Sequence, residues 1–209
     1  MKKFLAAMML LASTSLMADP MAGVEYNTTA QNIPTENAAK VEVTELFWYG
    51  CGHCYQLEPQ LHAWANKLPD DVVFKRVPGL PRPDWAPMAK AYYAMETLGV
   101  LDKLHNKLFD AMHKQKTLNP TDETAAINWV AKEGGLDKKK VQEAFNSFSN
   151  NTKLNRAAQV FRASGATGVP SLIIDGKYVT SSSMAGGNVQ VLKVADYLIA
   201  KARDRKSVV

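Results

Sequence analysis

Two cysteines, Cys51 and Cys54, stand in a sequence of 209 residues, separated only by Gly52 and His53. Thiols at this spacing can close a small disulfide ring, and no other cysteine competes for either partner. Residues 41–49 before them have the pattern of a buried strand, and an amphipathic helix follows. The first cysteine would then lie at a helix N-terminus, where free amide groups and the helix dipole favour a thiolate. The spacing therefore predicts thiol–disulfide exchange.

Other chemistries of paired cysteines fit the sequence less well. A zinc site needs a second ligand pair, which His53 and His62 do not supply at the usual spacing. Haem attachment needs a histidine directly after the second cysteine, and Tyr55 occupies that position. We expect no metal and no cofactor apart from the Cys51–Cys54 disulfide. A thiol-dependent copper chaperone stays open as an alternative function.

The first 18 residues have the layout of a secretory signal peptide. Lys2 and Lys3 form a basic start, residues 4–12 are apolar without charge, and small residues lead to a cleavage point near Ala18. The apolar run is shorter than the roughly 20 residues that a membrane-spanning helix needs. The sequence thus predicts an exported protein of the periplasm, an oxidising compartment in which disulfides persist.

Composition fits a globular protein without a nucleic-acid partner. Hydrophobic residues make up 46% of the chain, and the formal net charge is +5. The basic cluster at residues 201–206 would be the natural place for nucleic acid to bind. In an exported protein, a solvated and frayed helix end is the better interpretation of that cluster.

Hydrophobic periodicity predicts a mixed α/β chain. Strands at 41–49 and 72–77, joined by a helix, would form a right-handed βαβ unit with parallel strands. Between residues 84 and 150 the pattern is helical and contains no convincing strand. The remaining expected elements are a helix at about 152–164, a β-hairpin at 171–180 and a closing helix from 189.

The order of these elements resembles the DsbA family of periplasmic thiol:disulfide oxidoreductases. The motifs that carry the resemblance are FWYGCGHCYQLE at 47–58, AYYAM at 91–95, LFDAMH at 108–113 and GVPSL at 168–172. The resemblance implies an α/β thioredoxin fold built from residues 19–80 and 151–209, with a helical domain inserted at 81–150. Family members often carry Pro-His between the cysteines, where this chain has Gly52-His53.

The function that the resemblance implies is donation of the Cys51–Cys54 disulfide to exported proteins during their folding. Partners would be unfolded or partly folded proteins with cysteines, and a membrane quinone-linked reoxidase of the DsbB type. A weaker oxidant that acts as a disulfide isomerase or reductase stays open, because Gly52-His53 is the pair of eukaryotic protein disulfide isomerases. Only a short segment precedes the first core strand, so we expect a monomer without an oligomerisation stalk.

Roles within this chemistry follow from position. Cys51 is the expected nucleophile, and Cys54, one turn further along the helix, is the expected resolving thiol. His53 is expected to favour the Cys51 thiolate by hydrogen bonding or positive charge. The resemblance also implies a catalytic cis proline at Pro170, beside the cysteines.

Further residues are expected to bind substrate or to support the cysteines. In thioredoxin-like folds the backbone of the residue before the proline, here Val169, pairs with the substrate chain, and Gly52 would adjoin it. The resemblance implies a buried charge cluster of Glu45, Glu58 and Lys75 behind the cysteines, which would handle protons near Cys54. An apolar rim for unfolded clients could come from Trp48, Tyr49, Tyr55 and Met184.

Overall fold

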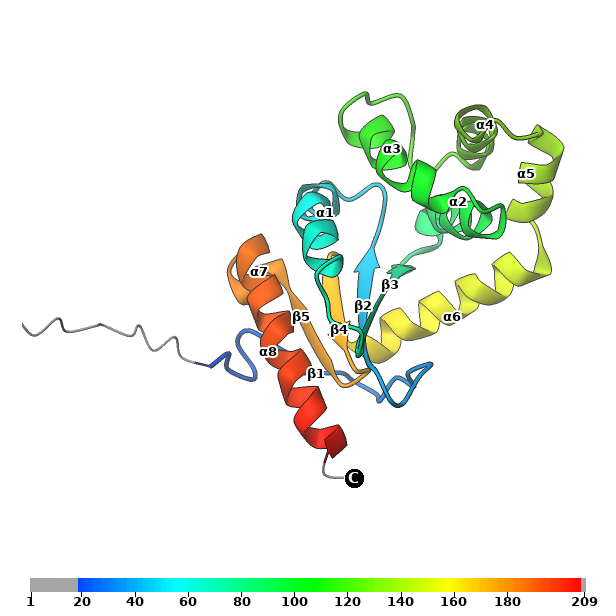
Figure 1. The fold of residues 1–209 in the computed structure, drawn as a ribbon. Helices are drawn as coiled ribbons and strands as arrows, with labels where there is room; N and C mark the ends of the chain where they lie inside the picture. The colour runs from blue at the N-terminus through cyan, green and yellow to red at the C-terminus, as the bar shows by residue number, and fades with distance from the viewer. Residues whose placement is uncertain (1–18, 208–209) are drawn as a thin grey trace, which may run out of the picture.

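The computed structural model describes residues 19–207, so the expected signal peptide at 1–18 lies outside the described residues. Among the described residues, no helix is long and apolar enough to cross a membrane. The elements in chain order (Figure 1) are β1 (Asn27–Thr28), β2 (Val41–Phe47), α1 (Gly52–Ala65), β3 (Val72–Pro78), the 3-10 helix η1 (Pro83–Trp85), α2 (Ala86–Thr97), α3 (Leu101–His113), α4 (Glu123–Gly134), α5 (Lys138–Phe145), α6 (Phe148–Ser164), β4 (Ser171–Ile174), β5 (Tyr178–Ser181), α7 (Ser182–Ala185) and α8 (Asn188–Ser207).

A mixed sheet with the strand order β1-β5-β4-β2-β3 forms the centre of the fold. β2 pairs in parallel with β3 through the crossover helix α1, which confirms the expected βαβ unit. On its other side β2 pairs antiparallel with β4, and β4 continues into β5 through a tight turn. Three residues, Asp175, Gly176 and Lys177, connect the paired strand ends. Asp175 and Gly176 have positive φ values of 52° and 63°, and the Lys177 N–H closes the turn on the Ile174 carbonyl oxygen at 3.0 Å.

Helices cover both faces of the sheet (Figure 1). On one face, Leu57 of α1 and Leu198 of α8 belong to the same buried cluster as Val43 of β2. On the other face, Phe161 of α6 packs with Leu46 of β2. Because successive strand residues point to opposite faces, β2 contributes to both layers and is buried along its whole length.

Helices α2 to α5 gather at one end of the sheet (Figure 1) and share one large core with Phe47 and Tyr49. This region lies between β3 and α6 in the chain, where the sequence predicted only helices. The helix expected at about 152–164 begins earlier, at Phe148, because Ser147 caps it and accepts a hydrogen bond from the Asn150 N–H at 3.1 Å. The expected domain boundary after residue 150 therefore falls inside α6, and the division into domains stays a prediction.

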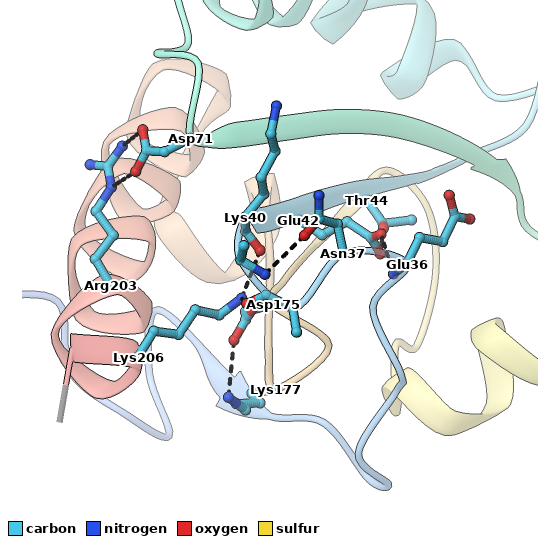
Figure 2. A network of polar contacts seen from close by, with 12 residues as sticks. Glu36, Asn37, Lys40, Glu42, Thr44, Asp71, Asp175, Lys177, Arg203 and Lys206 are labelled. Atoms are coloured by element: carbon cyan, nitrogen blue, oxygen red, sulfur yellow. Dashed lines mark hydrogen bonds and ion pairs between the residues drawn. The ribbon is translucent and has the colours of Figure 1, made fainter. Parts of the chain in front are cut away.

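The end of α8 is tied to the sheet by charged side chains (Figure 2). The ammonium groups of Lys206 and Lys177 lie 2.7 Å and 3.0 Å from the two carboxylate oxygens of Asp175, which is buried. Arg203 donates two hydrogen bonds to Asp71, at 2.5 Å and 2.7 Å. A buried carboxylate is costly unless it is paired, so the contact between Lys206 and Asp175 anchors the helix end, and the exposed Arg203–Asp71 pair adds less. Our interpretation of residues 201–206 as a solvated, frayed end is wrong for these side chains.

The hairpin turn generates a test of the fold. A Cβ atom added at Gly176 would collide with the backbone carbonyl oxygen of Ile33, whereas one at Gly99, with a similar φ of +69°, would meet nothing within 4 Å. We expect Gly99→Ala to lower the free energy of unfolding by roughly 1 kcal/mol through backbone strain alone. Gly176→Ala should cost at least about 2 kcal/mol more, because backbone must move. Urea unfolding of both variants measures the difference, and equal losses would contradict the close approach.

Candidate redox-active site

Cys51 is the N-cap residue of α1. Its backbone is extended (φ −89°, ψ 114°), and its sulfur accepts a hydrogen bond from the Cys54 N–H at 3.4 Å. The Cys51 thiol in turn donates to the carbonyl oxygen of Val169, also at 3.4 Å. Both cysteines are free thiols in this structure. The sulfur therefore occupies the position where free amides and the helix dipole stabilise negative charge.

The two thiols differ strongly in acidity. The pKa of Cys51 is lowered to about 6. The largest cause is a hydrogen bond from the Cys54 side chain, burial opposes it, and the backbone N–H groups of Cys54 and His53 and the charge of His53 contribute to the lowering. Burial raises the pKa of Cys54 well above its usual range, and its side chain has no exposed surface. At neutral pH the pair is thus a partly accessible thiolate next to a buried thiol, as an attacking and a resolving cysteine require.

A pocket of about 300 Å³ lies next to His53 and Val169, the residue whose carbonyl oxygen contacts Cys51 Sγ. The Val169–Pro170 peptide bond is cis, as expected from the sequence, and the loop around it forms one wall. The residues that line the pocket are mostly polar: His53, Thr167, Gly168, Val169, Pro170, Ser171, Ser181, Ser182, Ser183 and Asn188.

A larger groove, of about 1210 Å³, lies on the α6 side of the sheet. Its lining includes Thr44, Lys75 and Val160 but neither cysteine and no residue of the Val169–Pro170 loop. Size alone would favour this groove as a binding site, but the smaller pocket is lined by His53, which lies between the cysteines, and by Val169, whose carbonyl oxygen lies 3.4 Å from Cys51 Sγ. We therefore assign the redox site to the smaller pocket.

Glu45 is completely buried on the α1 side of the sheet. Arg76 connects it to a second buried carboxylate, with Nε 3.0 Å from Glu45 Oε2 and Nη2 2.8 Å from Glu58 Oε1. Burial raises the pKa of Glu45 to about 8; the Arg76 charge opposes this, and the negative charges of Glu58 and Cys51 add to it. Burial also acts to raise the pKa of Glu58, but the nearby His105 and the Arg76 charge hold it below its usual value.

Lys75 does not belong to this cluster, so that part of the prediction is wrong. The parallel register of β2 and β3 places Arg76 opposite Glu45 and Lys75 opposite Thr44, and neighbouring strand residues point to opposite faces. The Lys75 ammonium pairs with Glu42 at 2.8 Å on the α6 side. Strand 72–77 carries apolar residues on both faces, so its pattern alone did not indicate which basic residue faces α1.

Helix α3 supplies contacts that the sequence analysis missed. The Tyr49 hydroxyl lies 2.7 Å from His105 Nδ1, and the Tyr49 carbonyl oxygen lies 2.7 Å from His113 Nε2. The Tyr55 hydroxyl donates to Asp110 at 2.9 Å. Tyr49 is 1% exposed and therefore belongs to the core, not to the expected rim. A signal was present: His105 and His113 are eight residues apart, on the apolar face of their helix.

Comparisons of the sequence and of the structure with known proteins point to the same family. The model of the DSBA-like thioredoxin domain matches residues 72–198. The curated thiol:disulfide interchange protein DsbA of Pseudomonas aeruginosa is 39% identical over 203 residues, which cover 95% of each chain. The DsbA of Burkholderia cepacia is 37% identical over 213 residues, 99% of this chain and 100% of its own. The crystal structure of Pseudomonas aeruginosa DsbA matches with a TM-score of 0.81 and 37% identity, covering 90% of this chain and 97% of that chain.

The raised pKa of the buried Glu45 predicts how the free energy of unfolding changes with pH. Its carboxyl titrates near 8 in the folded protein against an ordinary value of 4.5, so between these values the folded state binds more protons than the unfolded state. Its contribution to stability is complete below pH 4.5 and is lost as pH rises towards 8. The side chain of Glu45→Gln cannot lose a proton. Between pH 5 and 8 the wild type should therefore lose up to about 4 kcal/mol of its free energy of unfolding relative to the variant. Urea unfolding of the dithiol forms tests this, and curves that stay parallel would exclude a raised pKa.

Proposed function

The chain belongs to the DsbA family of thiol:disulfide oxidoreductases, and from that membership we propose which of its residues carry each step of the reaction and where it takes place. The protein is a protein disulfide oxidase with a thioredoxin-like fold, and it donates a disulfide to substrate proteins. The family works through its own cysteine pair and uses no separate redox cofactor. The observation that carries our assignment is the contrast between the partly accessible, acidic Cys51 and the buried Cys54.

We assign the two exchanges as follows. A client thiolate attacks the Cys51 sulfur of the disulfide form, the bond to Cys54 breaks, and the Cys54 sulfur takes up the electron pair and a proton. A second client thiolate then attacks the client sulfur of the mixed disulfide, and Cys51 leaves as a thiolate. The client gains a disulfide, and the protein is left with the dithiol pair. The low pKa of Cys51 favours the second step, because a stabilised thiolate is a good leaving group.

Glu45 is our candidate for the group that exchanges a proton with Cys54. The Glu45 charge contributes to the raised pKa of Cys54, so the two groups interact electrostatically. With its own pKa raised to about 8, Glu45 holds a proton at neutral pH and can give it up. Arg76 and Glu58 support it, in place of the Lys75 that the sequence suggested.

The client segment is proposed to run along Val169, next to the pocket. When Cys51 is protonated, the Val169 carbonyl oxygen accepts its S–H. In the thiolate and in a mixed disulfide the sulfur has no proton, so this carbonyl is then available to a backbone N–H of the client, as in strand addition. At Gly52, directly after Cys51, an added Cβ would meet nothing within 4 Å, so this position leaves open space for the client. Pro170 and His53 complete the contact surface.

We further propose that the protein acts in the periplasm on exported proteins with cysteines and is reoxidised by a quinone-linked membrane protein of the DsbB type. The basic, apolar and small-residue layout of residues 1–18 supports export. Family membership supports both kinds of partner. A disulfide donor needs an oxidant to renew its disulfide after each turnover, because exchange only moves the oxidised state from one protein to another.

Single serine substitutions should separate the roles of the two cysteines. Cys54→Ser leaves Cys51 able to attack a disulfide but removes the thiol that resolves the product, so mixed disulfides with clients should accumulate. Cys51→Ser should form none, because the remaining thiol is buried and holds its proton. Non-reducing gels of cells that express each variant measure the adducts. Adducts through Cys54 in the Cys51 variant would reverse the assignment.

His53→Ala should make the protein a weaker oxidant. The substitution keeps the backbone N–H of residue 53 and removes only the side-chain charge that helps to lower the pKa of Cys51. We expect the pKa of Cys51 to rise by up to about one unit, which corresponds to a reduction potential lower by roughly 30 mV. Thiolate absorbance titration and equilibrium with glutathione should move together. An unchanged titration would make His53 a bystander on the surface.

A further inference from the structure

His105 of α3 carries an unused donor at the edge of the buried carboxylate cluster. Its side chain is 9% exposed, and its Nε2 lies 3.6 Å from Glu58 Oε1, just beyond hydrogen-bond distance. Nε2 has no hydrogen-bond partner, and neither has the buried Oε2 of Glu58. The buried Nε2 thus lies without a hydrogen-bond partner close to a carboxylate whose Oε1 accepts from Arg76 and whose Oε2 is unpaired, and each unmade hydrogen bond is costly in a protein interior.

The hydrogen bond at the other ring nitrogen fixes where His105 carries its proton. Tyr49 is buried and its pKa is raised by burial well above the usual value, so the hydroxyl keeps its proton and donates it to Nδ1. A neutral imidazole that accepts at Nδ1 carries its hydrogen at Nε2. The Nε2–H therefore points towards Glu58. Burial lowers the pKa of His105, so the ring is neutral at pH 7.

We propose that His105 is a positioning residue. When Glu45 gives up its proton, the Nε2–H of His105 donates a hydrogen bond to Glu58, and the Arg76 guanidinium is then free to stabilise the Glu45 carboxylate. Arg76 contacts both carboxylates in the dithiol form, at 3.0 Å and 2.8 Å. Once Glu45 is ionised, one guanidinium must serve two negative charges in a medium of low dielectric constant. A second donor on Glu58 relieves that competition.

Several other groups face His105 and bear on its titration. They are Tyr49 after β2, Glu58 and His62 of α1, Arg76 of β3 and Tyr92 of α2. The positive charges of Arg76 and His62 act against a second proton on the ring, while Glu58 acts in favour of it. The ring thus acts as a neutral donor through the pH range in which Glu45 titrates.

Two amide substitutions of His105 can separate the roles of its two ring nitrogens. In His105→Gln the amide N–H₂ can reach the position of Nε2 and donate to Glu58. In His105→Asn the shorter amide can replace only Nδ1 and keep the contact with Tyr49. The measured quantity is the rate at which Cys54 releases glutathione from a Cys51–glutathione mixed disulfide, as a function of pH. That rate depends on removal of the Cys54 proton, which we assign to Glu45, so the inference rests on the proposed function.

We expect the midpoint of this profile to lie near pH 8 in the wild type and in His105→Gln. In His105→Asn it should move up by about half a unit to one unit, which lowers the rate at pH 7 roughly three- to tenfold. The titration of Cys51 should stay at about 6 in both variants, because His105 is not among the groups that shift it. Urea unfolding is measured alongside, since a role in packing alone would change stability and leave the midpoint in place.

Two results would overturn the inference, and they can be told apart. If the asparagine and glutamine variants have the same midpoint, the donor to Glu58 has no role, while the assignment of Glu45 stands. If Glu45→Gln leaves the wild-type profile unchanged, Glu45 is not the group that titrates, and both the proposed role of Glu45 and the inference about His105 fail.

Discussion

The structure depends above all on a negative sulfur held at the first turn of a helix. Cys51 caps α1 and accepts a hydrogen bond from the Cys54 N–H, so the helix that carries the resolving thiol also stabilises the attacking one. This arrangement needs a strand that delivers the chain to the helix start, which β2 does, and a loop that approaches from the other side, which the Val169–Pro170 turn does. Most of the fold can be understood as the support for these three segments.

Beneath that helix the protein buries charge, which is expensive unless it is paired. Glu45 and Glu58 share one guanidinium, and each keeps an oxygen without a hydrogen-bond partner. A fully paired cluster would be more stable but would hold its protons in one state. Here burial outweighs the partial pairing with Arg76 and raises the pKa of Glu45 to about 8, close to the working pH, which suits a group that must both hold and release a proton.

The sequence allowed the reactive chemistry to be predicted because that chemistry is local. Two cysteines one helical turn apart and a proline before a hairpin can be recognised from neighbouring residues. The wrong prediction for the buried cluster concerns residues that are paired between strands far apart in the sequence. The choice of Arg76 over Lys75 is set by the register between β2 and β3, which a single strand does not reveal when both of its faces are apolar. The start of α6 at Phe148 was missed for a local reason, because the cap at Ser147 was not recognised.

The helical region connects to the redox site through Tyr49, in addition to the hydrogen bond between Tyr55 and Asp110. Tyr49 precedes Cys51 by two positions, and α3 holds both of its polar groups, the hydroxyl through His105 and the carbonyl through His113. The Tyr49 ring lies in the core that the inserted helices share with Phe47 of the sheet. Any displacement of α3 must therefore move the chain segment that sets the position of the Cys51 sulfur, since a close-packed interior transmits small shifts. The inserted helices are thus structurally continuous with the redox site, and their packing is part of what fixes the geometry of the thiolate.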